Sequence, residues 1–328
     1  MAAHRIDTHT HILPPDYATW LRGRGADAGG LPIPDWSEDA ALAAMDARSV
    51  QTAIVSVSTP GVHLGHAREA RGGHAREARG GRAREGDVRE ARDMARRVND
   101  YCAELATRRA GRFGFFATLT LPDVEGALDE LARAFDTLGA DGVILLANTH
   151  GTYLGDEDQT PLFDELNRRG AVVFIHPSFL PGTVVPGVPP FAVDFLLDTT
   201  RAAIRLMTSG TLARCPNIKM ILSHAGGFVP YAAHRIAVTM SPKAVSDGLA
   251  TLKRFYFDTA LSGSPAALPS LLAFAAPDHV LFGTDWPHAP APVGAAFTGM
   301  YEAYPMTRAQ RESIDHRAAE ALFPRRAR

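Results

Sequence analysis

Two histidines one residue apart stand near the start of the sequence, in the run Asp7-Thr8-His9-Thr10-His11. They belong to a segment, 5–13, whose composition favours a β-strand. Because side chains alternate along a strand, His9 and His11 point to the same side, where two imidazoles could hold one metal cation. An isolated pair of this kind is more often an ordinary pair of core or surface histidines, so the spacing alone does not decide.

Three further candidate ligands stand at the ends of other predicted strands: His176 after 171–176, His224 after 219–224 and Asp285 after 280–285. In a parallel barrel these ends meet at one mouth. Histidines with a carboxylate suit Zn²⁺, and the mixed nitrogen and oxygen donors leave Mn²⁺ open. Such a metal can activate water or polarise a substrate oxygen, while an unligated histidine transfers protons near neutral pH.

Eight apolar runs, each followed by a stretch long enough for a helix, set the fold that must position these residues. The runs are 5–13, 53–58, 113–121, 142–147, 171–176, 219–224, 255–259 and 280–285, and the clearest helices between them are 37–49, 88–108 and 124–138. Several runs are continuously hydrophobic, which is typical of parallel strands buried on both faces. We therefore expect an α/β fold, a TIM-type (β/α)8 barrel. An open doubly wound sheet stays possible, although no G-x-G-x-x-G motif follows any strand.

One segment interrupts this pattern after the second strand. Residues 65–72 read GHAREARG, residues 73–80 repeat them, and a third, degraded copy begins at Gly81. Paired glycines at a period of eight interrupt a helix, and the copies offer little apolar surface beyond alanine. We expect one barrel domain over 1–328 with a flexible repeat insertion at 63–87. A metal site formed by His63, His66 and His74, or an acidic partner for the arginines, is the less favoured alternative.

The composition excludes several classes of partner. The chain of 328 residues has 34 Lys and Arg against 36 Asp and Glu, a formal charge of −2, which offers no long-range attraction to nucleic acid or to an anionic membrane. No apolar run approaches the length of a membrane span. Cys102 and Cys215 are too few for a disulfide framework, which favours a reducing, cytoplasmic compartment.

Taken as a set, the site motifs resemble the metal-dependent amidohydrolase superfamily, and more narrowly its aminocarboxymuconate-semialdehyde decarboxylase branch. The motifs are His9-Thr10-His11, His176-Pro177, His224-Ala225-Gly226-Gly227 and Gly283-Thr284-Asp285-Trp286-Pro287. The resemblance spans nearly the whole chain apart from the repeat. It implies one divalent metal, Zn²⁺ before Mn²⁺, and no organic cofactor. It also implies that the ligands are His9, His11, His176 and Asp285, with His224 and Asp285 as the catalytic pair. The second metal of other amidohydrolases is not expected, because 142–147 contains no lysine.

The resemblance further implies a small carboxylic acid as substrate and non-oxidative decarboxylation as the reaction. Hydroxybenzoate or salicylate and muconate-semialdehyde types both fit, and the segment Asp198-Thr199-Thr200-Arg201 is similar to the 6-methylsalicylate decarboxylase subgroup. In this branch an arginine, here Arg235, reaches the neighbouring subunit's site, which implies a homodimer. Arg22 and Arg24 are the candidates for a first-loop arginine that binds the substrate carboxylate. Aromatic side chains expected near the substrate are Trp20, Phe179, Phe191, Phe228 and Trp286.

Two other functions stay open at this point. The same ligands could activate hydroxide to hydrolyse a lactone, an amide or a ring-cleavage product. A barrel retained as a binding or scaffold protein is the third possibility, and the complete ligand set argues against it.

Overall fold

The computed structural model describes residues 4–64, 85–182, 185–240 and 244–327. Eight parallel strands form one sheet in the order β1-β2-β3-β4-β7-β8-β9-β10. Their bounds are β1 Arg5–His11, β2 Val50–Ser56, β3 Phe113–Thr118, β4 Gly142–Leu146, β7 Val172–His176, β8 Lys219–Leu222, β9 Tyr256–Asp258 and β10 Val280–Leu281. Most repeat copies, at 65–84, lie outside the described residues, so the predicted insertion stays a prediction.

The sheet closes on itself where the segment after β10 meets β1. The backbone N–H of Thr8 donates to the carbonyl of Phe282 (2.9 Å), and that of Asp285 donates to the carbonyl of His9 (2.7 Å). Thr10 and Trp286 form a parallel bridge further along. The predicted barrel is therefore confirmed, and the alternative of an open doubly wound sheet is wrong.

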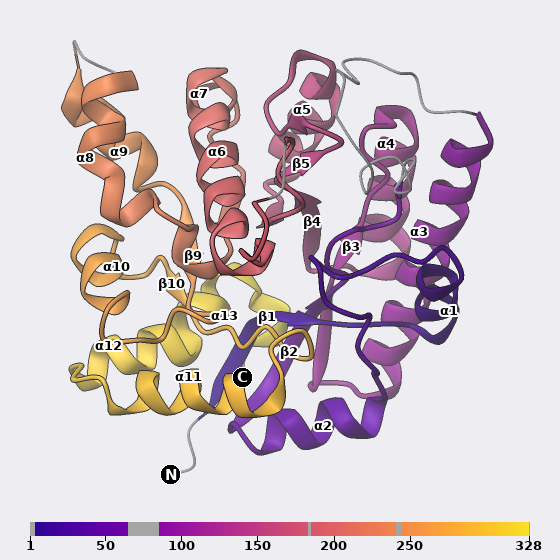
Figure 1. Cartoon of the computed structure of the whole chain (residues 1–328), viewed down its shortest axis with the longest axis horizontal. Helices are drawn as coiled ribbons and strands as arrows, with labels where there is room; N and C mark the ends of the chain where they lie inside the picture. The colour runs from indigo at the N-terminus through magenta and orange to yellow at the C-terminus, as the bar shows by residue number, and fades with distance from the viewer. Residues whose placement is uncertain (1–3, 65–84, 183–184, 241–243, 328) are drawn as a thin grey trace.

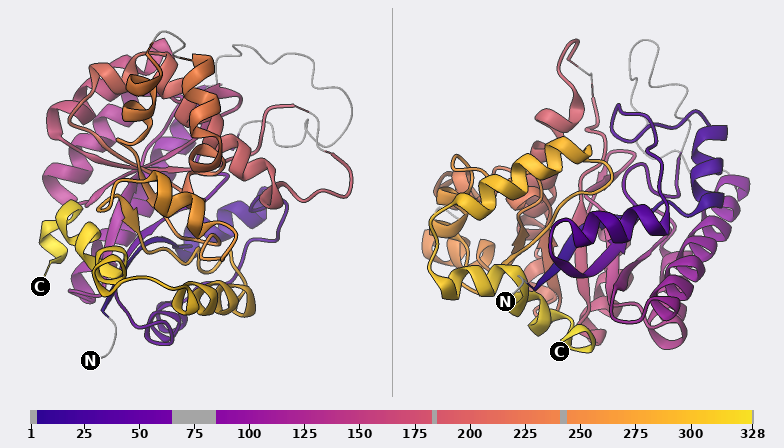
Figure 2. Two further views of the ribbon diagram at one scale, coloured as in Figure 1. Left: turned by 90° about the vertical axis from the view of Figure 1, so that its left-hand side faces the viewer. Right: turned by 90° about the horizontal axis from the view of Figure 1, so that it is seen from below.

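Helices surround the strands, as the two views at right angles make clear (Figures 1 and 2). The longer ones are α1 Pro15–Gly23, α2 Glu38–Asp46, α3 Glu85–Arg108, α4 Val124–Arg133, α5 Thr160–Arg169, α6 Asp194–Thr208, α8 Val229–Met240, α9 Val245–Leu252, α10 Leu268–Phe274 and α11 Ala291–Ala303. Shorter elements are the β5 Asn148–Thr149 and β6 Thr152–Tyr153 hairpin, α7 Thr211–Arg214, α12 Arg308–Glu312 and α13 Ala318–Leu322. Among these described residues, no helix combines the length and the apolar character needed to cross a membrane.

The three predicted helices are present, with ends set by local chemistry. Ser37 accepts a hydrogen bond from the N–H of Ala40 and caps α2. The 124–138 segment continues from α4 into a π-helix, Ala134–Leu138, and stops at Gly139, which adopts a left-handed conformation. Helix α3 begins at Glu85, three residues before the predicted start.

The predicted ends of two strands were wrong. His224 and Asp285 were expected to close strands, but β8 ends at Leu222 and β10 at Leu281. Both residues have positive φ, 53° and 61°, which a continuing strand does not allow. They stand on turns that re-aim their side chains into the mouth of the barrel.

Gly227 shows why the turn after β8 has its glycines. Its φ is +62°, and a Cβ there would lie 2.1 Å from the carbonyl oxygen of Leu196 in α6. We expect Gly227→Ala to lower the free energy of unfolding by about 2–4 kcal/mol, through strain and overpacking. Gly299→Ala is the matched control, since a Cβ at that position would meet no atom of the described residues within 4 Å and alanine favours a helix. Urea unfolding of both variants measures the difference, and equal stabilities would contradict this account of the turn.

Candidate active site

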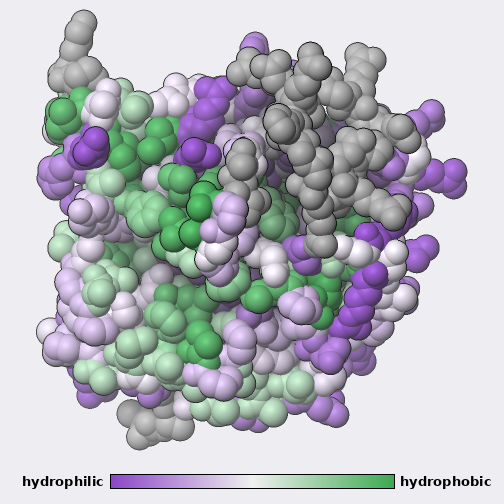
Figure 3. All heavy atoms as spheres, viewed as in Figure 1, coloured by the Kyte–Doolittle hydropathy of each residue, from purple (hydrophilic) through white to green (hydrophobic). Residues whose placement is uncertain are grey.

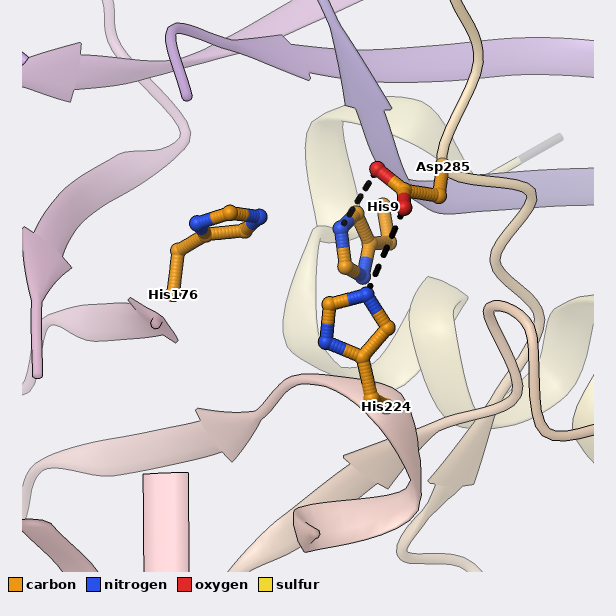
Figure 4. A group of neighbouring side chains, drawn as sticks. All are labelled: His9, His176, His224 and Asp285. Atoms are coloured by element: carbon orange, nitrogen blue, oxygen red, sulfur yellow. Dashed lines mark hydrogen bonds and ion pairs between the residues drawn. The ribbon is translucent and has the colours of Figure 1, made fainter. Parts of the chain in front are cut away.

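Four buried side chains from distant parts of the sequence converge at the carboxyl ends of the strands: His9, His176, His224 and Asp285 (Figure 4). One ligand atom from each lies within 4.8 Å of the corresponding atoms of the other three. One oxygen of the Asp285 carboxylate pairs with His9 and the other with His224, and His176 lies on the opposite side of the group from Asp285 (Figure 4). The convergence predicted from four strand ends is therefore present.

His11 completes the group. Its Nε2 atom lies 3.2 Å from Nε2 of His9 and 3.0 Å from Oδ1 of Asp285. The two histidines of the H-x-H run thus share one face, as their spacing predicts. His11 does not belong to the four-residue cluster whose ligand atoms lie within 4.8 Å of one another. There are therefore two overlapping sets of candidate ligands, which share His9, His176 and Asp285 and differ in whether His224 or His11 is the fourth.

Three of the imidazoles are oriented by hydrogen-bond acceptors that lie next to their Nδ1 atoms. Nδ1 of His9 lies 2.8 Å from Oδ2 of Asp258, Nδ1 of His11 lies 3.3 Å from the carbonyl of Ser56, and Nδ1 of His176 lies 2.9 Å from the carbonyl of Pro177. Because these acceptors hold the Nδ1 proton, the lone pair on each Nε2 is left for a metal. Nδ1 of His224 has no hydrogen-bond partner among the described residues.

The donor atoms fit a cation. Oδ1 of Asp285 is buried and makes no hydrogen bond within the described chain, yet it lies 3.0 Å and 3.4 Å from Nε2 of His11 and His9. Two nitrogen lone pairs and a carboxylate oxygen at these separations repel one another unless a positive charge lies among them. Nitrogen and oxygen donors from histidine and aspartate are those that Zn²⁺ and related divalent metals take.

The sequence matches the amidohydrolase family over residues 6–325. It is 36% identical over 341 residues to the decarboxylase macB of Penicillium terrestre, covering 98% of this chain and 95% of that protein. It is 37% identical over 332 residues to the 6-methylsalicylic acid decarboxylase of Penicillium expansum, covering 98% and 96%. The chain belongs to the amidohydrolase family.

The fold agrees with that assignment. A solved 5-carboxyvanillate decarboxylase from Novosphingobium aromaticivorans, complexed with manganese and 4-hydroxy-3-methoxy-5-nitrobenzoic acid, has the same fold. The TM-score is 0.81 over 98% of this chain and 96% of that one, at 22% identity. Within the amidohydrolase family, the two sequence relatives place the chain in the branch of aromatic-acid decarboxylases, as its motifs predict.

The charges around the site of this amidohydrolase are strongly coupled. Burial opposes protonation of His9, but the carboxylates of Asp258 and Asp285 outweigh it and raise the pKa of His9 to about 10. Burial lowers the pKa of His11 and of His176, so both are neutral near pH 7. Burial also opposes ionisation of Asp285, but the neighbouring imidazoles hold its pKa well below the usual range. In the metal-free protein the positive charge among these donors is therefore a proton on His9.

Metal binding should consequently be pH-dependent. The metal must displace the proton from His9, which holds it up to about pH 10, so affinity rises as the pH rises and falls in acid. We expect the dissociation constant to decrease about tenfold per pH unit between about pH 6 and pH 8. Competition with a metal-binding dye at several pH values measures this slope. A constant affinity over that range would show that no proton is displaced.

Asp258 is a functional residue that the sequence reasoning missed. It ends β9, is fully buried, accepts a hydrogen bond from the backbone N–H of His224 (3.0 Å) and holds Nδ1 of His9. Its place at the end of the seventh predicted strand, in Phe257-Asp258-Thr259, was the available signal. Asp258 orients the imidazole of His9 and holds the backbone of His224. We therefore expect Asp258→Asn to weaken metal affinity about 10–100-fold.

Equilibrium dialysis followed by metal analysis tests this expectation. Asp278→Asn, near the start of β10, is the control and should bind metal like the wild type. Unchanged affinity in Asp258→Asn would mean that His9 does not need its carboxylate partner.

The predicted aromatic residues are distributed unevenly. Trp286 follows Asp285 and lines a small cavity that also includes His11. Phe179 and Phe191 stand in the loops after β7 and are 38% and 45% exposed. Phe228 is partly buried at the start of α8, where its backbone N–H donates to the hydroxyl of Thr200. Phe195, which was not among the predicted residues, is buried with its ring centroid 6.4 Å from that of His176.

The predicted arginines lie at the surface or in ion pairs with other carboxylates of the chain. Arg235 is exposed on α8. Arg22 pairs with Asp35 (2.7 Å), and Arg24 pairs with Glu90. The two first-loop candidates thus pair with carboxylates of the chain itself, and their contact with a substrate carboxylate stays a prediction.

Two histidines other than those of the active site have contrasting surroundings. His288 lies with its ring centroid 5.0 Å from that of His11, and burial lowers its pKa to about 3, so it is neutral. His63 lies 3.2 Å from His150 and belongs to no metal-type cluster among the described residues. His66 and His74, its predicted partners in the alternative site, lie outside those residues.

Proposed function

We propose that this amidohydrolase is a metal-dependent, non-oxidative decarboxylase of a small aromatic carboxylic acid. The observation that carries the proposal is the convergence of the imidazoles of His9, His176 and His224 with the carboxylate of Asp285 at one buried place. The relatives supply the reaction class, since both of the Penicillium proteins that align with nearly the whole chain are decarboxylases.

The ligands we assign are His9, His11, His176 and Asp285, and the acid/base group is His224. The first three are the imidazoles whose Nδ1 protons have fixed acceptors. His224 lacks such an acceptor among the described residues, and its Nε2 lies 3.4 Å from Oδ2 of Asp285, the carboxylate oxygen opposite the one that His9 and His11 face. His224 is therefore the imidazole best placed to gain and lose a proton.

When bound, the metal supplies a positive charge that attracts the substrate carboxylate and an adjacent hydroxyl oxygen. We propose Zn²⁺ as the resident ion, with Mn²⁺ as the alternative favoured by the manganese in the solved 5-carboxyvanillate decarboxylase. We infer no organic cofactor, because decarboxylation of a hydroxybenzoate needs only a proton.

The chain's own residues then transfer one proton to the substrate. His224 delivers it to the ring carbon that bears the carboxylate, and the ring supplies the electron pair for the new C–H bond. The bond to the carboxylate then breaks, its electron pair restores aromaticity, and carbon dioxide leaves. The carboxylate of Asp285 stabilises the protonated form of His224 before transfer, and solvent returns the proton afterwards.

The surroundings favour an aromatic substrate. The ring centroid of Phe195 lies 6.4 Å from that of His176, the ring centroid of Phe174 lies 4.9 Å from that of His9, and Trp286 follows Asp285 in the chain. An apolar lining with a few convergent polar groups suits a substituted ring. We propose an ortho-hydroxybenzoate, with 6-methylsalicylic acid as the first compound to test because the Penicillium expansum relative is named for it. Phe179, Phe191 and Phe228 would complete the lining.

We also propose a homodimer with Arg235 at its interface. Helix α8, which carries Arg235, exposes Tyr231 (85%), Val238 (56%) and Met240 (46%). In Figure 3, which has the view of Figure 1, hydrophobic residues lie at the upper left, where α8 and α9 are, as well as toward the centre of the face. The single catalytic domain over 1–328 and the cytoplasmic location stay predictions; the two cysteines, both free and buried, are consistent with a reducing compartment.

Incubation of metal-replete enzyme with a panel of hydroxybenzoates, without oxygen, tests the proposal. We expect stoichiometric carbon dioxide and the corresponding phenol from at least one ortho-hydroxybenzoate. Failure to release carbon dioxide from any of them would favour the hydrolase alternative, which uses the same ligands to activate water.

A further inference from the structure

A second cluster of metal-binding side chains lies at the opposite end of the barrel. His4 precedes β1, His316 lies in the π-helix Ser313–Arg317, and Glu320 lies in α13. One ligand atom from each lies within 4.8 Å of those of the other two. His4 stands five residues before His9, directly before the strand that carries it, so about 16 Å of extended chain separates the cluster from the active site.

The distances within the cluster match those of a metal site. Nε2 of His4 lies 3.5 Å from Oε1 of Glu320, and Nδ1 of His316 lies 3.2 Å from Oε2 of the same carboxylate. With zinc–ligand bonds of about 2.0–2.2 Å, two ligands of a tetrahedral ion lie about 3.3 Å apart. The ring centroids of His4 and His316 are 5.1 Å apart, so the two imidazoles flank the carboxylate closely.

A buried ion pair holds the two histidines in place. Their chain neighbours Arg5 and Asp315 are joined by a hydrogen bond of 3.1 Å between Nε and Oδ1. Arg5 also donates to the carbonyl of Arg48 and to Glu302, and the Tyr301 hydroxyl donates to Asp315. The backbone on both sides of the cluster is thus fixed by groups that do not belong to it, which reduces the cost of ordering the ligands.

The local helix geometry contributes to the same arrangement. The π-turn lets Asp315 make a buried contact with Arg5 while His316 and Glu320, four residues apart, contact each other across the junction with α13. Such turns occur frequently at functional sites. In Figure 1 the C-terminal helix α13 lies beside β1, and β1 contacts both the π-helix and α13.

The cluster is open enough for an ion to enter. The side chains of His4, His316 and Glu320 are 17%, 22% and 24% exposed. An ordinary ion pair between a protonated histidine and Glu320 would need only one imidazole. Here both imidazoles lie next to the carboxylate of Glu320. Together they supply two nitrogen donors and one oxygen donor, which suits a zinc site with three protein ligands and a water at the fourth position.

We propose that His4, His316 and Glu320 bind a divalent transition metal, Zn²⁺ by its ligand chemistry, separate from the catalytic metal. This ion ties the residue before β1 to the last helices of the chain. Its role is structural, because the substrate site lies at the other end of the barrel. The inference does not depend on the reaction that the active site performs.

Metal counting on the holoenzyme tests the proposal. The enzyme is loaded with its catalytic metal, dialysed against low-micromolar Zn²⁺, and the total metal per chain is measured. We expect two ions per chain in the wild type and one in Glu320→Gln or His316→Ala, with Zn²⁺ affinity at the lost site falling at least about 100-fold. The control Glu312→Gln removes a carboxylate nearby that pairs with Arg308 and Arg317, and it should keep both ions.

Asp285→Asn isolates the second site. With the catalytic site disabled, Co²⁺ should still give the visible absorption bands of a tetrahedral complex, and adding Glu320→Gln should abolish them. Decarboxylase activity of the single variant Glu320→Gln should match the wild type, which also shows that it is folded. Equal metal contents in the wild type and Glu320→Gln, whether one ion or two, would overturn the proposal.

Discussion

Replacing Asp285 by asparagine is expected to remove the catalytic metal and to lower kcat/KM by at least about 10³-fold, since a catalytic metal supplies several kcal/mol. Among the described residues, Asp285 provides the carboxylate oxygen that faces both His9 and His11, at 3.4 Å and 3.0 Å. Asparagine keeps the shape of the side chain but removes the negative charge that offsets the ion. The imidazoles alone would then hold the metal weakly.

Metal analysis after dialysis, combined with the hydroxybenzoate assay, measures both effects. Asp136→Asn is a suitable control, because Asp136 is an exposed carboxylate that pairs with Arg169 and is not one of the five site residues. A variant of Asp285 that retains a full equivalent of catalytic metal would show that the carboxylate acts only in proton transfer.

Replacing His224 by alanine is expected to have the opposite pattern: metal retained and kcat reduced by about 10²–10⁴-fold, the range typical of a lost acid/base group. The expectation follows from the separation of the two carboxylate oxygens, because His224 faces Oδ2 of Asp285 at 3.4 Å while His9 and His11 face Oδ1. KM should change little, since His224 is assigned to the proton and not to substrate binding.

His11→Ala is the matched comparison for His224→Ala. The close cluster includes His224 and leaves out His11, whereas our assignment makes His11 the ligand. We therefore expect His11→Ala to lose metal and His224→Ala to keep it. The reverse result would mean that His224 is the ligand and that His11 has the proton role.

The eight strand-helix units could be predicted from the sequence because each strand is a buried apolar run with a helix after it. Phe174 and Phe116, for example, stack at 5.3 Å inside the sheet, and both belong to such runs. Closure could not be predicted, because it depends on backbone hydrogen bonds between residues near 8–11 and 282–286 that leave no periodic signal.

The site was predictable to the extent that its residues end predicted strands. His9, His11 and His176 lie at the ends of β1 and β7, and the turns at His224 and Asp285 carry those side chains to the same place. Asp258 was missed because a single aspartate at a strand end has many structural roles, and only its contact with His9 reveals this one. The partners of Arg22 and Arg24 were also unpredictable, since ion pairs on loops depend on the tertiary structure.

The source of the hydrogen and oxygen atoms in the product tests the central claim most directly. Metal-replete enzyme is incubated with 6-methylsalicylic acid in deuterated water enriched in oxygen-18, and the aromatic product is analysed by NMR and mass spectrometry. We predict 3-methylphenol with one deuterium at the ring carbon that bore the carboxylate, between the hydroxyl and methyl substituents, and no oxygen-18. An aromatic product that contains solvent oxygen, or one that retains its carboxylate, would contradict decarboxylation by proton transfer from His224.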